Sequence, residues 1–160
     1  MKRKSNRSGR ASPREFSHLD EVGAVRMVNV VAKPVQQRRA VAVGTLICRP
    51  ATIRALRAQA LPKGDVLAVA RVAAMQAVKR TADLIPLCHP LPIEHTEVSF
   101  RIAKDCVEIE CVVATAAKTG VEMEALTGVS IAALTLYDMC KAVDKGMWIE
   151  GIRVVEKTKT

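Results

Sequence analysis

The chain has 160 residues, of which 49% are hydrophobic and 2% are aromatic, and its net charge is +9. This length and hydrophobic content predict a folded domain with a core and exclude a disordered chain. No apolar run reaches the roughly 18 residues of a membrane span, and the N-terminus lacks the apolar stretch of a signal peptide. We therefore expect no membrane partner.

Much of the positive charge lies in the first 14 residues, which contain six Lys or Arg and no acidic residue. The remainder has 19 basic and 16 acidic residues and is close to neutral. We interpret residues 1–15 as a disordered basic tail and residues 16–160 as a single domain. Contact of the tail with phosphate or RNA is the alternative. Because the chain is poor in aromatic residues for stacking bases, we expect no nucleic-acid partner.

In chain order, apolar and β-branched residues predict a short strand or extended segment over residues 25–31 and a strand over residues 38–48. Pro50 suits the first position of a helix over residues 50–60. Asp65 can cap a second helix over residues 66–82, which ends before a proline.

Alternating polar and apolar residues predict an antiparallel hairpin over residues 96–102 and 107–115. A third helix is predicted over residues 121–143, and a closing strand over residues 147–157. This order of elements indicates an α+β fold of ferredoxin-like outline, with helices on one face of a mainly antiparallel sheet.

The third helix is apolar on nearly all sides. From Ala125 to Val143 its only charged residues are Asp138 and Lys141. Such a helix is buried on more than one side, and we expect the sheet on one side and another subunit on the other. Asp138 and Lys141 are three residues apart and face the same way. They are either a structural ion pair in the core or an acid–base pair in a cleft.

Two further segments contain charged residues. Thr119 and Glu122 match a capping box, which would explain Glu122 structurally, whereas Glu124 has no such explanation. In Lys63-Gly64-Asp65, a turn and a helix cap account for the last two residues and leave Lys63 free.

Cys88 and His89 are adjacent and lie between prolines. The pair has three interpretations: a metal site, a nucleophile with its base, or a rigid turn. Only His95 lies near enough in sequence to add a metal ligand, so we expect no metal site. Neighbours in an extended chain point to opposite faces. We therefore expect Cys88 to pack in the core and His89 to face a cleft as a proton shuttle or phosphate donor. His18 and His95 look like surface residues.

The five cysteines are an odd number and include no CxxC pair. Together with the missing signal peptide, this indicates free thiols in a reducing cytoplasm.

Four stretches, MVNVVAKP, KGD, AAMQAVKRTADLIPLCHPLPI and TGVEMEALTGVSIAALTLYDMCKAVDKGM, closely resemble one family. This is the molybdenum cofactor biosynthesis protein C family, the cyclic pyranopterin monophosphate synthases. The resemblance covers about residues 16–157. It implies a ferredoxin-like fold and a homohexamer, a trimer of dimers with active sites at the dimer interface. It also implies conversion of 3′,8-cyclo-7,8-dihydro-GTP to cyclic pyranopterin monophosphate with release of pyrophosphate.

By this resemblance Asp138 is the acid–base residue and Lys141 stands beside it. The implied catalytic set is completed by Lys63, His89, Glu122 and Glu124, and the implied substrate-binding residues are Leu87, Cys88, His89, Met123, Glu124, Lys157 and Arg38. Several proton transfers and a leaving pyrophosphate suit such a set of acids, bases and cations. The chemistry requires no redox cofactor, and Mg²⁺ with the triphosphate is possible.

Two departures from the family pattern matter. Asn29 replaces the usual aspartate, so no charge-based role transfers to this position. The Gly-rich, Lys-containing segment that usually follows Lys157 is missing, and without it we expect Lys157 to be weakly held. A non-catalytic phosphate-binding or scaffold protein is the rival class. We expect Asp138, Lys141, Lys63 and Glu124 to converge if the chain is an enzyme.

Overall fold

One antiparallel sheet of four strands, in the order β2-β3-β1-β4, forms one layer of the protein. The computed structural model describes residues 24–59 and 61–160, so the predicted basic tail and His18 lie outside the described residues. The strands are β1 (Gln36–Ile47), β2 (His95–Ile102), β3 (Cys106–Ala117) and β4 (Trp148–Lys159), and the helices are α1 (Pro50–Arg57), α2 (Val66–Val78), α3 (Thr81–Leu84) and α4 (Glu122–Cys140).

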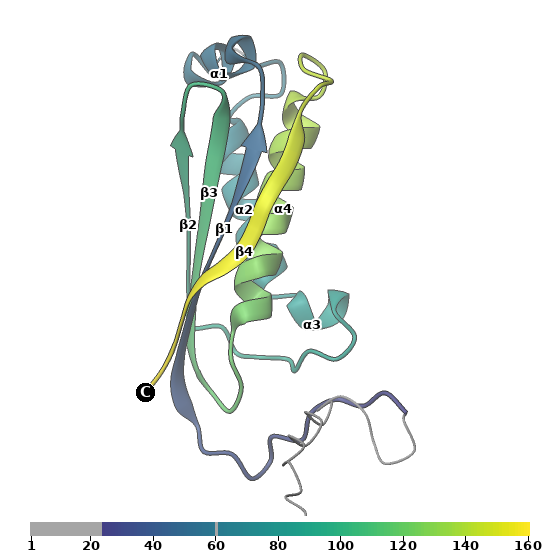
Figure 1. The fold of residues 1–160 in the computed structure, drawn as a ribbon, viewed down its shortest axis with the longest axis vertical. Coiled ribbons are helices and arrows are strands. Elements are labelled where there is room, and N and C mark those ends of the chain that lie inside the picture. The colour runs from purple at the N-terminus through teal and green to yellow at the C-terminus, as the bar shows by residue number, and fades with distance from the viewer. Residues whose placement is uncertain (1–23, 60) are drawn as a thin grey trace, which may run out of the picture.

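The long helices α2 and α4 run along the same face of this sheet (Figure 1). The predicted α+β architecture is therefore confirmed, and the order strand, helices, two strands, helix, strand is that of ferredoxin-like folds. The predicted hairpin is also confirmed, because β2 and β3 pair antiparallel across a three-residue connection at residues 103–105. Asp65 caps α2 as expected, since its carboxylate accepts a hydrogen bond of 3.0 Å from the Ala68 amide.

Of the two alternatives for residues 25–31, the strand does not form, and side chains hold this segment instead. One predicted helix is wrong in its extent. The helix predicted over residues 66–82 ends at Val78, and α3 begins at Thr81. The Thr81 hydroxyl donates to the carbonyls of Ala77 and Val78, at 3.3 and 3.0 Å. A hydroxyl that bonds to the preceding turn competes with regular helix geometry, which accounts for the interruption.

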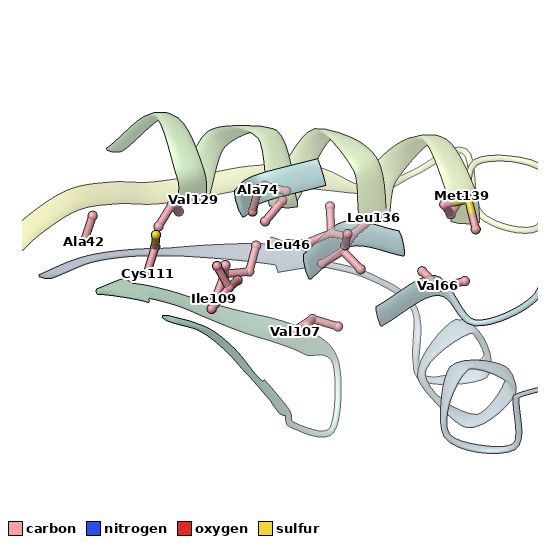
Figure 2. Packing of buried hydrophobic residues seen from close by; sticks show 14 of the residues in the cluster. Ala42, Leu46, Val66, Ala74, Val107, Ile109, Cys111, Val129, Leu136 and Met139 are labelled. Carbon is pink, nitrogen blue, oxygen red and sulfur yellow. The ribbon is translucent and has the colours of Figure 1, made fainter. Parts of the chain in front are cut away.

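Helix α4 is enclosed by two layers of its own chain. One side packs on the sheet and another on α2. The small residue Ala74 of α2 lies in the buried cluster (Figure 2), and Ala70 of α2 belongs to the same cluster. A methyl group at Gly128 would lie 2.6 Å from the Cys111 sulfur and 2.8 Å from a Val78 methyl carbon. Helix α2 thus covers part of the side of α4 on which another subunit was expected, and the subunit contact itself stays a prediction.

A stripe of α4 nevertheless stays in contact with solvent in the single chain. Leu134 is 55% exposed and Met123 is 38% exposed, while Ile131 between them is half-buried. These residues leave an apolar surface along the length of α4.

We predict that Gly128→Ala lowers the free energy of unfolding by about 1–3 kcal/mol, the usual cost of overpacking a core. Helix propensity alone predicts the opposite sign, a gain of up to about 1 kcal/mol. Urea unfolding measures the difference, and Ser130→Ala at a half-exposed position of the same helix is the matched control. A stabilised Gly128→Ala protein would contradict the close approach.

Candidate functional site

A pocket of about 460 Å³ lies at the N-terminal end of α4. Three segments form it: residues 28–33, the loop after α3, and the first turn of α4 with the residues before it. Its lining residues are Val28, Lys33, Leu87, Cys88, His89, Leu91, Thr119, Gly120, Glu122, Met123 and Glu124. Six of the predicted site residues, Leu87, Cys88, His89, Glu122, Met123 and Glu124, are therefore together.

Cys88 and His89 both line this pocket, so the expectation that they point to opposite faces is wrong. A hydrogen bond of 3.0 Å from the Cys88 amide to the Ile85 carbonyl closes a turn at Pro86 and Leu87, directly before this pair. Burial and the nearby Glu124 carboxylate raise the pKa of the Cys88 thiol, which keeps it protonated and weakly nucleophilic.

His89 is fixed by its contact with the segment before β1. Its Nε2 lies 2.9 Å from the Val28 carbonyl oxygen, so Nε2 carries the proton and donates it to this bond. The ring is thereby oriented, and Nδ1 is the nitrogen that remains to exchange a proton or accept a hydrogen bond.

Glu122 is not part of a capping box. Helix α4 begins at Glu122 with Val121 as its N-cap, and no side chain caps it, so Thr119 lies too far back. Glu122 instead forms an ion pair with Lys157 of β4. Partial burial works to raise the pKa of Glu122, but the hydrogen bond from Lys157 and the charges of Lys157 and Arg38 outweigh it, and the pKa is lowered.

Arg38 and Lys157 support the pocket without lining it. The Arg38 guanidinium donates to the carbonyls of Ala117 and Lys118, at 3.3 and 3.4 Å, and so holds the loop that leads into α4. Lys157 is anchored in β4, opposite Ala40 of β1, and by its ion pair with Glu122. The side chain of Lys157 is nevertheless 61% exposed, so the expectation that it is weakly held stays a prediction.

Glu124 is the most deeply buried carboxyl group of the pocket, with 3% of the residue exposed. Its Oε2 is buried and has no hydrogen-bond partner among residues 24–59 and 61–160. Burial raises the pKa of Glu124, and the neighbouring Glu122 carboxylate raises it further. A buried oxygen without a partner costs free energy unless a ligand or a proton satisfies it, so this carboxyl group is suited to hydrogen-bonding a substrate.

A second cluster lies near the other end of α4. Asp138 accepts from Lys63 at 2.9 Å and from Lys141 at 2.7 Å, one lysine on each carboxylate oxygen. The Lys63 ammonium also donates to the Asp138 carbonyl at 3.1 Å. The two lysines lower the pKa of Asp138 to about 2, Lys141 contributing most, and the pKa of Lys141 is raised in turn.

This cluster is not a core ion pair. The side chains of Lys63, Asp138 and Lys141 are 42%, 55% and 56% exposed in the single chain. Lys63 reaches Asp138 because Gly64, with φ of +82°, turns the chain directly before the cap at Asp65. Of the four residues expected to converge, Lys63, Asp138 and Lys141 do so.

Glu124 is the exception. Fourteen residues separate it from Asp138 along α4, which corresponds to about 21 Å of helix. The expectation that Glu124 joins Asp138, Lys141 and Lys63 is therefore wrong within one chain. The two ends of the helix carry different parts of the predicted set.

Sequence reasoning missed Lys33, Val28, Leu91 and Thr119 as pocket residues. Lys33 lies within one of the family-like stretches, but no spacing connects it to residues 87–124. His95 is exposed at the start of β2, as expected for a surface histidine. The five cysteines are free.

Neither a metal cluster nor a membrane helix is found in the described part of the chain. Residues 24–59 and 61–160 contain no group of three or more His, Cys, Asp or Glu side chains placed to hold a metal ion. Within the same residues no helix has the length and apolar character needed to span a bilayer.

The buried carboxyl group leads to a prediction about stability and pH. The pKa of Glu124 is higher in the folded chain than in the unfolded chain. Protonated Glu124 therefore stabilises the fold fully at a pH below the unfolded pKa. This stabilisation is lost as the pH rises through the folded pKa. Glu124→Gln cannot ionise, so its free energy of unfolding should rise relative to the wild type as the pH increases above the ordinary pKa of a glutamate. Urea unfolding at several pH values measures this. Glu110→Gln, at an exposed position of β3, gives the background, and an equal trend in both variants would contradict the prediction.

Comparisons with known proteins agree with the resemblance. Residues 27–160 match the profile of the MoaC family. The chain is 57% identical over 145 residues to a cyclic pyranopterin monophosphate synthase of Thermomicrobium roseum, covering 89% of this chain and 87% of that protein. It is 56% identical over 145 residues to the synthase of Chloroflexus aggregans, covering 89% and 88%. It is 54% identical over 144 residues to a molybdenum cofactor biosynthesis bifunctional protein of Chlorobaculum tepidum, covering 90% of this chain and 46% of that protein. The chain belongs to the MoaC family.

Proposed function

We propose that this protein converts 3′,8-cyclo-7,8-dihydro-GTP to cyclic pyranopterin monophosphate and releases pyrophosphate, as a lyase of molybdenum cofactor biosynthesis. This proposal is supported by relatives that are named cyclic pyranopterin monophosphate synthase and align with 89% of this chain. The pocket volume of about 460 Å³ suits a small-molecule ligand. The observation that carries the proposal is the pair of charged clusters on α4, a carboxyl and imidazole pocket at one end and a Lys-Asp-Lys cluster at the other.

We infer that two subunits build each active site. Because α4 is a continuous helix, it keeps Glu124 and Asp138 about 21 Å apart in one chain. One substrate meets both clusters when a partner brings its own Lys63, Asp138 and Lys141 to the pocket. The exposed apolar stripe at Ile131 and Leu134 would then be covered by that partner. This agrees with the homohexamer, a trimer of dimers, that the family resemblance implies.

Asp138 can act as a proton acceptor only after its lysines are engaged elsewhere. With a pKa of about 2 between two ammonium groups, it is a weak base near neutral pH. Substrate phosphates compete for Lys63 and Lys141, and the loss of these contacts raises the pKa of Asp138. In this mechanism the substrate activates its own base, while the two lysines stabilise the negative charge of the leaving pyrophosphate.

The pocket residues supply the complementary functions. Glu124, whose pKa is raised, is suited to donate a hydrogen bond or a proton when protonated, and the oriented His89 is suited to exchange a proton through Nδ1. Glu122 and Lys157 hold each other at the edge of the pocket. Leu87, Cys88 and Met123 provide apolar contacts to the ring system.

Ring opening and closure are proton transfers and bond rearrangements without net oxidation, so we propose no redox cofactor. Mg²⁺ accompanying the triphosphate remains part of the proposal. The free thiols support a reducing compartment, the cytoplasm.

The rival function is a phosphate-binding scaffold of the same fold. Incubating the purified protein with the cyclised dihydro-GTP and following pyrophosphate release separates the two.

For catalysis we predict that Asp138→Asn lowers kcat by about 10²–10⁴, because the amide keeps the shape but cannot exchange a proton. Substrate should still bind, and thermal stability should be unchanged because the side chain is exposed in the single chain. Asp83→Asn, an exposed carboxylate paired with Arg80 at 3.7 Å, is the matched control. A variant that melts early but turns over normally while folded would show Asp138 to be structural.

For the shared site we predict complementation between two inactive variants. Asp138→Asn disables the Lys-Asp-Lys cluster, and His89→Ala disables the pocket. Refolding the two chains together should form mixed dimers in which one site has both intact halves, so activity should return. Each variant refolded alone is the control. Activity that stays absent in verified mixed oligomers would contradict a site shared between subunits.

A further inference from the structure

Residues 28–33, here called the strap, contribute Val28 and Lys33 to the lining of the pocket. The segment leads toward β1 (Figure 1). The strap has no regular secondary structure apart from a turn, yet side chains of other segments hold its backbone at two points. His89 Nε2 donates to the Val28 carbonyl at 2.9 Å, and the Lys118 ammonium donates to the Val31 carbonyl at 2.8 Å. Both of these side chains belong to segments that form the pocket or directly precede them.

The strap is also shaped from within. The Asn29 side chain accepts a hydrogen bond of 2.9 Å from the Val31 amide, and the Lys33 amide donates to the Val30 carbonyl at 3.0 Å. Pro34 follows, and a residue before proline is restricted to extended conformations. These constraints fix the backbone of Lys33, and Lys33 is one of the residues that line the pocket.

The Lys33 ammonium differs from the other cations around this pocket. Lys118 is bound to the Val31 carbonyl, Lys157 to Glu122, and Arg38 to two backbone carbonyls. No hydrogen bond or ion pair connects the Lys33 ammonium to another described residue. A positively charged group is thus available for an anion at this side of the pocket.

We propose that Lys33 binds a phosphate group of the triphosphate substrate, and that the strap is the element that positions it. This inference rests on the proposed function, because phosphates are the anions of that substrate. An ammonium group that meets a phosphate oxygen forms a charge-assisted hydrogen bond, stronger than one between neutral groups. Lys33 binds substrate and takes no part in proton transfer.

The test compares Lys33→Met, which keeps the length of the side chain and removes its charge, with Lys33→Arg. The wild-type oligomer and both variants are assayed for kcat and KM with the cyclised dihydro-GTP, and for inorganic pyrophosphate binding by calorimetry. We expect Lys33→Met to raise KM and the pyrophosphate Kd about tenfold, which corresponds to about 1.4 kcal/mol, with kcat unchanged. Lys33→Arg should retain most of the affinity. Lys104→Met, in the exposed turn between β2 and β3, controls for net charge.

Equal KM and Kd values in Lys33→Met and wild type would overturn the proposal, and so would an equal loss in Lys104→Met. Thermal unfolding of Lys33→Met should match the wild type, and an early melting that accounts for the weaker binding would also overturn it. If the wild type releases no pyrophosphate from substrate, the proposed function fails. A Lys33-dependent pyrophosphate Kd would still support the anion contact in that case.

The role of the strap is tested by a double-mutant cycle with Lys118→Met. If Lys118 acts by holding the strap, its substitution raises KM in the wild type but adds little in the Lys33→Met background. Effects that add fully would show that Lys118 contacts the substrate itself and that the strap does not position Lys33.

Discussion

The arrangement of the site depends on the close packing of α4 between α2 and the sheet. Gly128 leaves no room for a methyl group against Cys111 and Val78, and the helix is therefore fixed on two sides at its middle. A helix held in this way keeps both of its ends in place relative to the sheet. The pocket at its start and the Lys-Asp-Lys cluster near its end are consequently features of one rigid element, and their separation is set by the length of that element.

The two carboxyl groups on this helix have opposite electrostatic environments. Glu124 is buried with one unsatisfied oxygen, and its pKa is raised, whereas Asp138 lies between two ammonium groups, and its pKa is lowered to about 2. Residue pairs whose surroundings separate their pKa values are suited to acid and base roles in one reaction. In one chain the two carboxyl groups are too far apart to act on one substrate. They could serve as acid and base in one reaction when two subunits meet, as in the proposed shared site.

The sequence predicted the elements better than their spatial relations. Helical and strand periodicity placed α1, α4 and the β2–β3 hairpin correctly, because burial of one face fixes the period of apolar residues. It missed the interruption after Val78, which depends on the hydroxyl of Thr81. For the site, motifs identified Lys63, Asp138 and Lys141, which do meet. They did not show that Glu124 lies at the opposite end of α4, although the continuous helix predicted over residues 121–143 implies that separation. Lys33 was missed as a pocket residue, because apart from Val28 the other lining residues are more than 50 residues away in sequence.

The replacement of the usual acid by Asn29 can now be interpreted physically. An asparagine keeps the side-chain oxygen that accepts from the Val31 amide, so the turn of the strap is preserved. It removes the negative charge that an aspartate would place four residues before Lys33, on the same short segment. Less negative charge on the segment that contains Lys33, which lines the pocket, favours the approach of a phosphate, since Coulomb forces act over several ångströms. The substitution thus retains the structural role of the position and, on the proposal for Lys33, makes the strap a more cationic surface for the substrate.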